Sequence, residues 1–343
     1  MAIGLKLRER QKRITRMKIL LIAVVLILMF IGSFNFGRYG ISLDSAGKIL
    51  LSTVVPMDQT WQSSDETVVL FIRFPRILAG VLIGGVLALA GTAYQAVFKN
   101  PLVSPDILGA SAGASLGAAI AIFSGLGSGW VQILAFLGSI GAVFLTLGVS
   151  RKVKKSPTLA LILSGIFISS LCSAIVSLIK FVADPNDKLP TLTYWLMGSL
   201  ANITINNLVW VILPMLLGIV PLMLLRWRMN VLSMGEDEAK ALGVETKRIR
   251  LIAILCSTIL TASAISIGGL IGWVGLVIPH LTRIFVGPDN KALIPASVLM
   301  GGAFLLLVDN FARTITSVEI PLGVLTAIVG APFFIALMIC SKE

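Results

Sequence analysis

A long charge-free run in the first third of the chain restricts the fold more than any other feature of the sequence. From Ile77 to Val97 there is no Asp, Glu, Lys or Arg, and most residues are apolar. A helix of this length rises about 31 Å, which matches the roughly 30 Å hydrocarbon core of a bilayer. Lipid offers no hydrogen-bond partner to backbone groups, so a segment that crosses it must be helical. The run therefore predicts a transmembrane helix.

The same run and the segment that follows it carry glycines spaced four residues apart. Gly80 and Gly84 lie in the run, and Gly109, Gly113 and Gly117 lie beyond the next break. Residues four apart share one face of a helix, and small residues there let a second backbone approach closely. We predict helices that pack against protein as well as against lipid.

The composition extends this prediction to the whole chain. Of the 343 residues, 57% are hydrophobic and 13% are charged, whereas a soluble domain has about 25% charged residues. We predict an all-α polytopic membrane protein, in which a basic cytoplasmic segment (residues 1–18) precedes a single transmembrane domain (19–343). This domain accounts for the length and leaves no room for a separate catalytic domain.

Charge-free runs predict about ten transmembrane helices. They cover 19–34, 77–97, two spans within 107–150, 158–179, 203–225, two short spans within 251–282, 292–308 and 320–340. Glycines at 125–129 and at 268–269 mark the turns inside the two double runs. Merging 251–282 into one span would give nine, and charge does not exclude that alternative. We also predict a short surface helix at 42–51.

The distribution of Lys and Arg predicts the orientation. With both termini in the cytoplasm, the cytoplasmic segments hold 21 of these residues and the outer segments hold 7. Positive charge is retained on the cytoplasmic side of a membrane, so this arrangement is the expected one. The net charge of +12 is thereby explained by topology, which argues against a nucleic-acid partner.

The cytoplasmic segment 226–250 contains a predicted helix. Ser233 and Glu236 have the spacing of a capping box, the acidic residues that follow suit the positive end of a helix, and Gly243 fits the position after its last turn. Such a helix is either a solvated connector or a docking element that transmits motion from a cytoplasmic partner.

Motifs for catalysis and metal binding are missing from the sequence. The segment 42–49 has the Gly-Lys pair of a phosphate-binding loop but lacks its first glycine and its final Ser or Thr, so we expect no ATP hydrolysis by this chain. The three cysteines are far apart and His280 is the only histidine, so we predict neither a metal site nor a cofactor.

Several charged residues are predicted at the outer face. We interpret Asp309 and Glu319 as interfacial charges that cap helices, which weakens the alternative of an ion-coupled carrier. Arg73, Arg76 and Arg313 lie where positive charge is disfavoured. They are either interfacial anchors or a docking surface for an acidic partner, because guanidinium groups bind carboxylates in a two-pronged fashion.

Six separated motifs share the order and spacing of a known family. They are Arg73-Phe-Pro-Arg76, Asn100-Pro-Leu-Val-Ser-Pro-Asp-Ile-Leu-Gly109, Ala239-x-x-Leu-Gly-Val244, Gly272-Trp-Val-Gly-Leu-Val-Ile-Pro-His280-x-x-Arg283, Asp309-x-x-Ala-Arg313 and Glu319-Ile-Pro-Leu-Gly323. Residues 20–340 thus resemble the FecCD-like permeases, the membrane subunits of type II ATP-binding cassette (ABC) importers for iron–siderophores, haem and vitamin B12.

The resemblance implies partners and site residues. A second permease subunit, identical or a sister chain, would complete the pathway in the cell's inner (cytoplasmic) membrane. Cytoplasmic ATPase subunits and an outer substrate-binding protein would dock on opposite faces. The implied binding-protein contacts are Arg73, Arg76 and Arg313; the implied ATPase-coupling residues are Glu236, Asp237, Glu238, Ala239, Leu242, Gly243 and Val244; the implied inner gate is Asn100, Leu102 and Thr158.

The resemblance also implies a cargo. We expect an iron(III)–siderophore chelate delivered by the binding protein, with cobalamin or haem as alternative cargoes of the same importer class. An ion-coupled secondary transporter is the alternative from another class, and it predicts uptake without an ATPase.

Overall fold

The protein is described by a computed structural model that covers residues 2–153 and 157–340. Every regular element in these ranges is helical. The α-helices are α1 (Ala2–Gly32), α2 (Leu43–Ser52), α3 (Ser63–Thr67), α4 (Phe74–Phe98), α5 (Ala110–Phe123), α6 (Ser128–Lys152), α7 (Pro157–Val182), α8 (Lys188–Met197), α9 (Ile205–Met234), α10 (Glu236–Ala241), α11 (Thr246–Gly268), α12 (Val274–Val286), α13 (Asn290–Thr314) and α14 (Leu322–Cys340). A π-helix, η1 (Val68–Arg73), joins α3 to α4, and a 3₁₀ helix, η2 (Pro105–Leu108), precedes α5.

Ten of these helices correspond to the predicted spans. Seven are long and apolar enough to cross a membrane, namely α1, the continuous α3–α4 segment, α6, α7, α9, α11 and α13. Three shorter apolar helices, α5, α12 and α14, supply the rest. The all-helical polytopic fold is confirmed, as is the surface helix, because α2 begins after Ser42, whose side chain caps it.

The two double runs divide where the glycines predicted. Residues between α5 and α6 turn at Gly125 and Gly127, and α11 ends at Gly268. The expectation of two short spans within 251–282 is wrong for the first one. Helix α11 begins at Thr246, inside the hydrophilic segment, so its first turns contain basic residues that precede the charge-free run. The helix is therefore 23 residues long.

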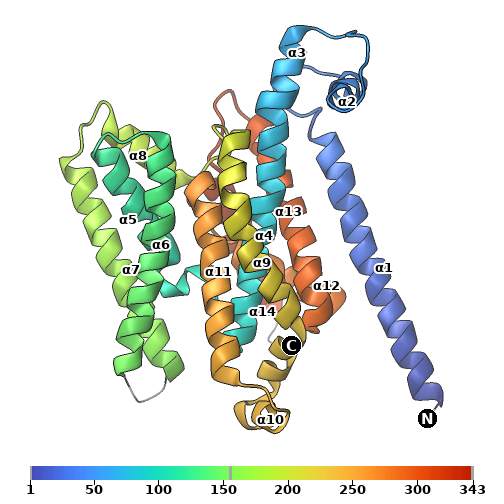
Figure 1. Cartoon of the computed structure of the whole chain (residues 1–343), viewed down its shortest axis with the longest axis vertical. Coiled ribbons are helices and arrows are strands. Elements are labelled where there is room, and N and C mark those ends of the chain that lie inside the picture. The colour runs from blue at the N-terminus through green and yellow to red at the C-terminus, as the bar shows by residue number, and fades with distance from the viewer. Residues whose placement is uncertain (1, 154–156, 341–343) are drawn as a thin grey trace.

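Helix α4 lies at the centre of the molecule (Figure 1) and is buried along most of its length by α9, α11, α12 and α13. Its glycines make this packing possible. A Cβ atom added at Gly84 would overlap the carbonyl oxygen of Gly301 on α13, whereas one added at Gly80 would meet only ordinary contacts. The predicted role of glycine in close helix packing is therefore confirmed at Gly84.

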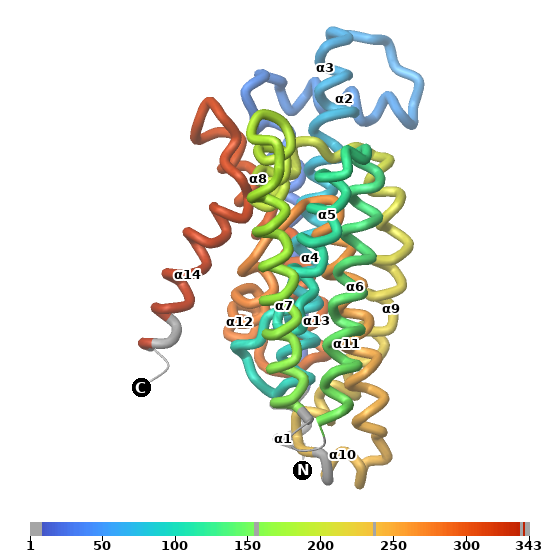
Figure 2. The backbone as a smooth tube through the Cα atoms, turned by 90° about the vertical axis from the view of Figure 1, so that its left-hand side faces the viewer, coloured from blue at the N-terminus to red at the C-terminus, as the bar shows by residue number. Residues whose placement is uncertain are grey.

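Two apolar helices lie at the periphery. Helix α1 packs mainly against α13 and exposes most of its apolar residues, as a lipid-facing helix does. Helix α14 leans away from the bundle (Figure 2), and its main helix contacts are with α8, α12 and α13.

The connecting segments gather at two opposite ends of the bundle (Figure 1). One end, here called the α2 end, carries α2, α3, the α7–α8 connection and the α13–α14 connection. The other, the α10 end, carries α10 and the amino terminus. Segments predicted outside and inside the cell therefore lie on different ends, and the assignment of each end to a side of the membrane stays a prediction.

Candidate functional site

The three arginines predicted at the outer face converge at the α2 end. Arg73 ends η1, Arg76 lies in the first turn of α4, and Arg313 lies in the last turn of α13. Their exposed fractions are 4%, 5% and 6%, so the fold encloses all three side chains. We call these residues, together with Asp309 and Glu319, the outer arginine cluster.

Asp309 bridges two of the arginines. Its Oδ1 lies 2.9 Å from both Nε and Nη2 of Arg76, and its Oδ2 lies 3.1 Å from Nε of Arg313. Asp309 is 0% exposed. The interpretation of Asp309 as an interfacial capping charge is therefore wrong, because it lies inside the bundle and joins α4 to α13.

Glu319 completes the coordination of Arg76 from the α13–α14 connection. Its Oε1 accepts a hydrogen bond of 2.8 Å from Nη1 of Arg76. Its side chain is 36% exposed, and in the described part of the chain its Oε2 has no hydrogen-bond partner. Glu319 is thus held by one oxygen only.

The segment that follows α1 covers the other two guanidinium groups. Arg73 donates to the carbonyl oxygens of Phe34 and Tyr39. Arg313 donates to the carbonyl of Phe36 at 3.2 Å, and it also bonds to the amide oxygen of Asn310. These partners belong to the same chain, so contacts between these arginines and a binding protein stay a prediction.

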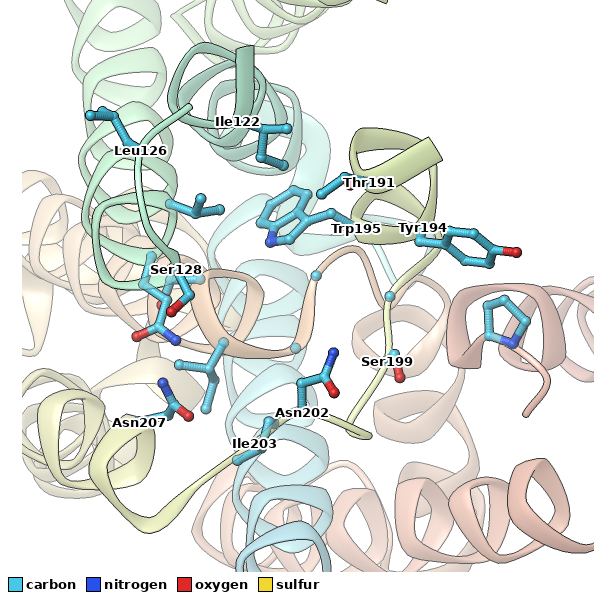
Figure 3. Close-up of a pocket in the computed structure, with 18 of the residues that line it drawn as sticks. Ile122, Leu126, Ser128, Thr191, Tyr194, Trp195, Ser199, Asn202, Ile203 and Asn207 are labelled. Carbon is cyan, nitrogen blue, oxygen red and sulfur yellow. The ribbon is translucent and has the colours of Figure 1, made fainter. Parts of the chain in front are cut away.

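A cavity of about 850 Å³ (Figure 3) shares Glu319 with this cluster. Hydrogen-bonding side chains without charge form much of its lining, among them Gln132, Asn202 and Asn207. The indole of Trp195 lies within the lining, whereas the ring of Tyr194 points away from it. Glu319 is one of the residues that line it. The sequence did not predict this cavity because its residues come from segments far apart in the chain.

Three helix ends meet where residues 198–199, 268–269 and 321 line the cavity. The backbone N–H of Ser199 donates to the carbonyl of Gly268 at 2.9 Å, and that of Leu322 donates to the carbonyl of Gly198 at 2.9 Å. Gly198 has a positive φ of 72°, and a Cβ there would overlap the carbonyl of Leu270. We call residues 197–199, 268–270 and 321–323 the helix junction, because they join the ends of α8 and α11 to the start of α14.

The predicted coupling segment forms the short helix α10 between α9 and α11. The predicted capping box is wrong. Helix α9 continues to Met234, so Ser233 bonds back to the carbonyl of Met229 at 3.0 Å, and Gly235 precedes α10 instead.

The end of α10 follows the prediction. Gly243 adopts a positive φ of 74°, and the N–H of Val244 donates to the carbonyl of Ala239 at 2.9 Å. Ala239 and Val244 are buried, Glu238 is exposed, and Leu242 is 56% exposed. The side chains of Glu236 and Asp237 lie outside the described part of the structure, so their coupling roles stay predictions.

The predicted inner-gate residues lie toward the α10 end. Lys99 ends α4 in a left-handed conformation, and the side-chain oxygen of Asn100 accepts the N–H of Leu102 at 2.9 Å. Leu102 is half exposed. Thr158 lies on a different element, in the first turn of α7, and is also exposed. The structure thus joins Asn100 to Leu102 in one turn and places Thr158 separately.

The cysteines and the histidine form no shared site in the described residues. Cys172 and Cys256 are buried free thiols, and no group of three His, Cys, Asp or Glu side chains within the described ranges could hold a metal ion. His280 is partly exposed on α12, one turn before Arg283.

Comparison with known proteins identifies the class. The fold matches a solved structure described as an inward-facing conformation of a metal-chelate type ABC transporter, with a TM-score of 0.83, 38% identity and coverage of 93% of this chain and 98% of that one. MolB, a molybdate import permease of Haemophilus influenzae, is 41% identical over 91% of this chain and 92% of its own. HmuU, a hemin transport permease of Yersinia pestis, is 34% identical over 93% and 94%.

These findings define a multi-pass membrane permease of the type II ABC importer class, whose members work with ATPase and substrate-binding partners. The chain belongs to the FecCD transport family, which matches residues 20–340. The resemblance drawn from the six sequence motifs is therefore confirmed.

Proposed function

We propose that this chain is the permease subunit of an ATP-driven importer that carries an iron(III)–siderophore chelate into the cytoplasm. The observation that supports it most strongly is the match, over 93% of the chain, to a metal-chelate type ABC transporter. A bulky chelate needs a wide pathway with few binding groups, so selectivity belongs to an outer binding protein that delivers the cargo.

Energy comes from a separate ATPase that docks on the coupling segment. The sequence has no complete phosphate-binding loop, so the partner subunit hydrolyses the ATP. Ala239 and Val244 anchor α10 to the bundle, and the exposed Leu242 is available for contact. Because α10 connects α9 directly to α11, a displacement of α10 by the ATPase is transmitted to these two long helices.

A second permease subunit encloses the pathway. Helix α14 leaves the bundle (Figure 2) and exposes apolar side chains along its length, such as Ile328 and Ile335. Another subunit would cover this surface. At the α10 end, Asn100, Leu102 and Thr158 form the inner gate, since all three belong to segments that end or begin a helix there.

Other cargoes of the same class have support from relatives. MolB has molybdate in its name and is 41% identical, which makes molybdate a second candidate. Haem and cobalamin have the same kind of support, from HmuU and from BtuC of Halobacterium salinarum, which is 36% identical over 84% of this chain.

Uptake into proteoliposomes tests the proposal. The permease is reconstituted with its co-purifying ATPase and binding protein, and radiolabelled ferric siderophore, molybdate, cobalamin and haem are supplied in turn. We expect accumulation of the ferric chelate that requires ATP and ceases when the ATPase is omitted. Accumulation of molybdate, cobalamin or haem alone would overturn the cargo, and uptake without the ATPase would overturn the importer mechanism in favour of an ion-coupled carrier.

A further inference from the structure

Glu319 is one of two carboxylates that hold Arg76 in the outer arginine cluster. We propose that the Glu319 carboxylate is a displaceable internal ligand of Arg76, which an Asp or Glu of the docking protein replaces. This inference rests on the proposed function, because it takes the substrate-binding protein as the partner at the α2 end.

Access to Arg76 is the first observation. Arg76 is 5% exposed, and its Nε, Nη1 and Nη2 atoms are all engaged by Asp309 and Glu319. A carboxylate from outside can therefore reach Arg76 only after one of these two has moved. If Arg76 contacts a partner at all, an exchange of carboxylates must come first.

The geometry identifies which carboxylate yields. Asp309 is 0% exposed, both of its oxygens accept hydrogen bonds from Arg76, and its Oδ2 also forms an ion pair with Arg313. Glu319 is 36% exposed, bonds through one oxygen, and lies on a connection rather than on a helix. Its Oε2 atom is buried and has no hydrogen-bond partner in the described residues. The Glu319 side chain also lines the 850 Å³ cavity. Glu319 can leave into that cavity, whereas moving Asp309 would strand two guanidinium groups.

The charge of the cluster indicates the chemistry of the incoming group. Three guanidinium groups face two carboxylates, and within the described residues Arg73 bonds only to the backbone carbonyls of Phe34 and Tyr39. A buried positive charge without a counter-charge is unfavourable. The cluster therefore favours an acidic incoming group, which takes over the negative charge that Glu319 supplies to Arg76, and a guanidinium group binds a carboxylate with two parallel hydrogen bonds.

The position of Glu319 gives the exchange a consequence for transport. Three residues further on, Leu322 donates to the carbonyl of Gly198, and Gly323 fits closely against the carbonyls of Met197 and Leu270. Release of Glu319 therefore frees the connection that enters the helix junction, where α8, α11 and α14 meet. Docking at Arg76 would in this way loosen the outer ends of helices that border the cavity.

The variant Glu319→Gln tests the exchange in the assembled transporter, reconstituted in lipid nanodiscs with its ATPase. Binding of the co-purified substrate-binding protein is measured by biolayer interferometry. We expect Glu319→Gln to lower the dissociation constant about tenfold. This factor applies when Glu319 holds Arg76 in about nine-tenths of the unsubstituted molecules. Asp58→Asn, a change of an exposed carboxylate in the α2–α3 connection, is the matched control and should leave the affinity unchanged.

The sign of the effect separates the proposal from a structural role. If Glu319 merely supported the fold, the Glu319→Gln transporter would bind the substrate-binding protein less tightly. A weaker or unchanged affinity for that protein would therefore overturn the exchange while leaving the proposed function intact. Absence of binding by the unsubstituted transporter would overturn both.

A second measurement tests the exchange through the distance between two spin labels rather than through binding affinity. Spin labels are placed at 194 and 318, both exposed positions on α8 and on the α13–α14 connection, after replacement of the native cysteines. We expect the distance distribution to broaden in Glu319→Gln without the binding protein, and in the unsubstituted chain only with it. Identical distributions in all these states would overturn the proposal.

Discussion

Asp309 shows how one side chain can hold two helices together inside a membrane protein. Its carboxylate accepts hydrogen bonds from Arg76 on α4 and forms an ion pair with Arg313 on α13, and none of its surface is exposed. Desolvation of three charges is unfavourable, and the pairing compensates for it only while every member is present. Removal of Asp309 would leave two buried guanidinium groups facing each other.

We therefore expect Asp309→Ala to lower the free energy of unfolding by about 3–5 kcal/mol. The matched control is Asp44→Ala, because Asp44 also pairs with a basic residue, Lys48, but these side chains are 73% and 42% exposed. An exposed pair contributes about 0–1 kcal/mol. Unfolding in detergent with increasing sodium dodecyl sulfate measures both. Equal losses in the two variants would contradict the assignment of Asp309 as a structural bridge.

The sequence could predict part of this cluster. Asp309 and Arg313 are four residues apart on one helix, a spacing that brings side chains together, so their pairing had a local signal. Arg76 and Glu319 are separated by 243 positions, and nothing in either neighbourhood indicates the other. The sequence predicted that the three arginines share one end of the bundle, but the interpretation of Asp309 failed because its partner Arg76 is distant in the sequence and meets it only in the folded chain.

At the scale of elements, apolar length and glycine spacing predicted the helices better than local caps did. Ten spans and both internal turns agree with the structure. The capping box at Ser233 did not form, because α9 extends through that position to Met234. The Ser233 hydroxyl donates to the carbonyl of Met229 within α9 instead of capping a new helix. A capping pattern is short, so a long neighbouring helix overrides it.

Helix α10 is the element whose function is most directly testable. Leu242 exposes 56% of its surface at the end of this helix, and we expect Leu242→Asp to reduce the amount of co-purifying ATPase by about tenfold or more, as loss of an apolar anchor at an interface does. Leu51→Asp is the matched control, since Leu51 is 57% exposed on α2 at the opposite end. Quantitative co-purification measures the effect. An equal yield of ATPase from the two variants would contradict docking at α10.

At the scale of the molecule, the structure separates two sets of connections along the bundle axis. The α7–α8 connection lies at the α2 end, and α10 lies at the other end (Figure 1). The sequence predicted this separation from alternating spans and from the excess of Lys and Arg in one set of segments. It could not predict how α14 departs from the bundle, because that placement depends on packing at the helix junction rather than on hydropathy.

The orientation of this axis gives the last prediction. A segment rich in Lys and Arg is retained in the cytoplasm, because moving its charges through the bilayer is unfavourable, and 226–250 carries six such residues whereas the segment predicted outside around residue 186 carries two, Lys180 and Lys188. Single cysteines introduced in a cysteine-free background at Asn186 and at Glu245, both exposed, are treated with a membrane-impermeant maleimide. We expect position 186 to be labelled from outside and position 245 to be labelled only after the membrane is permeabilised. The reverse pattern would invert the assignment of the two ends. Labelling of both positions from one side would contradict the separation of binding-protein docking from ATPase coupling, on which the proposed transport cycle depends.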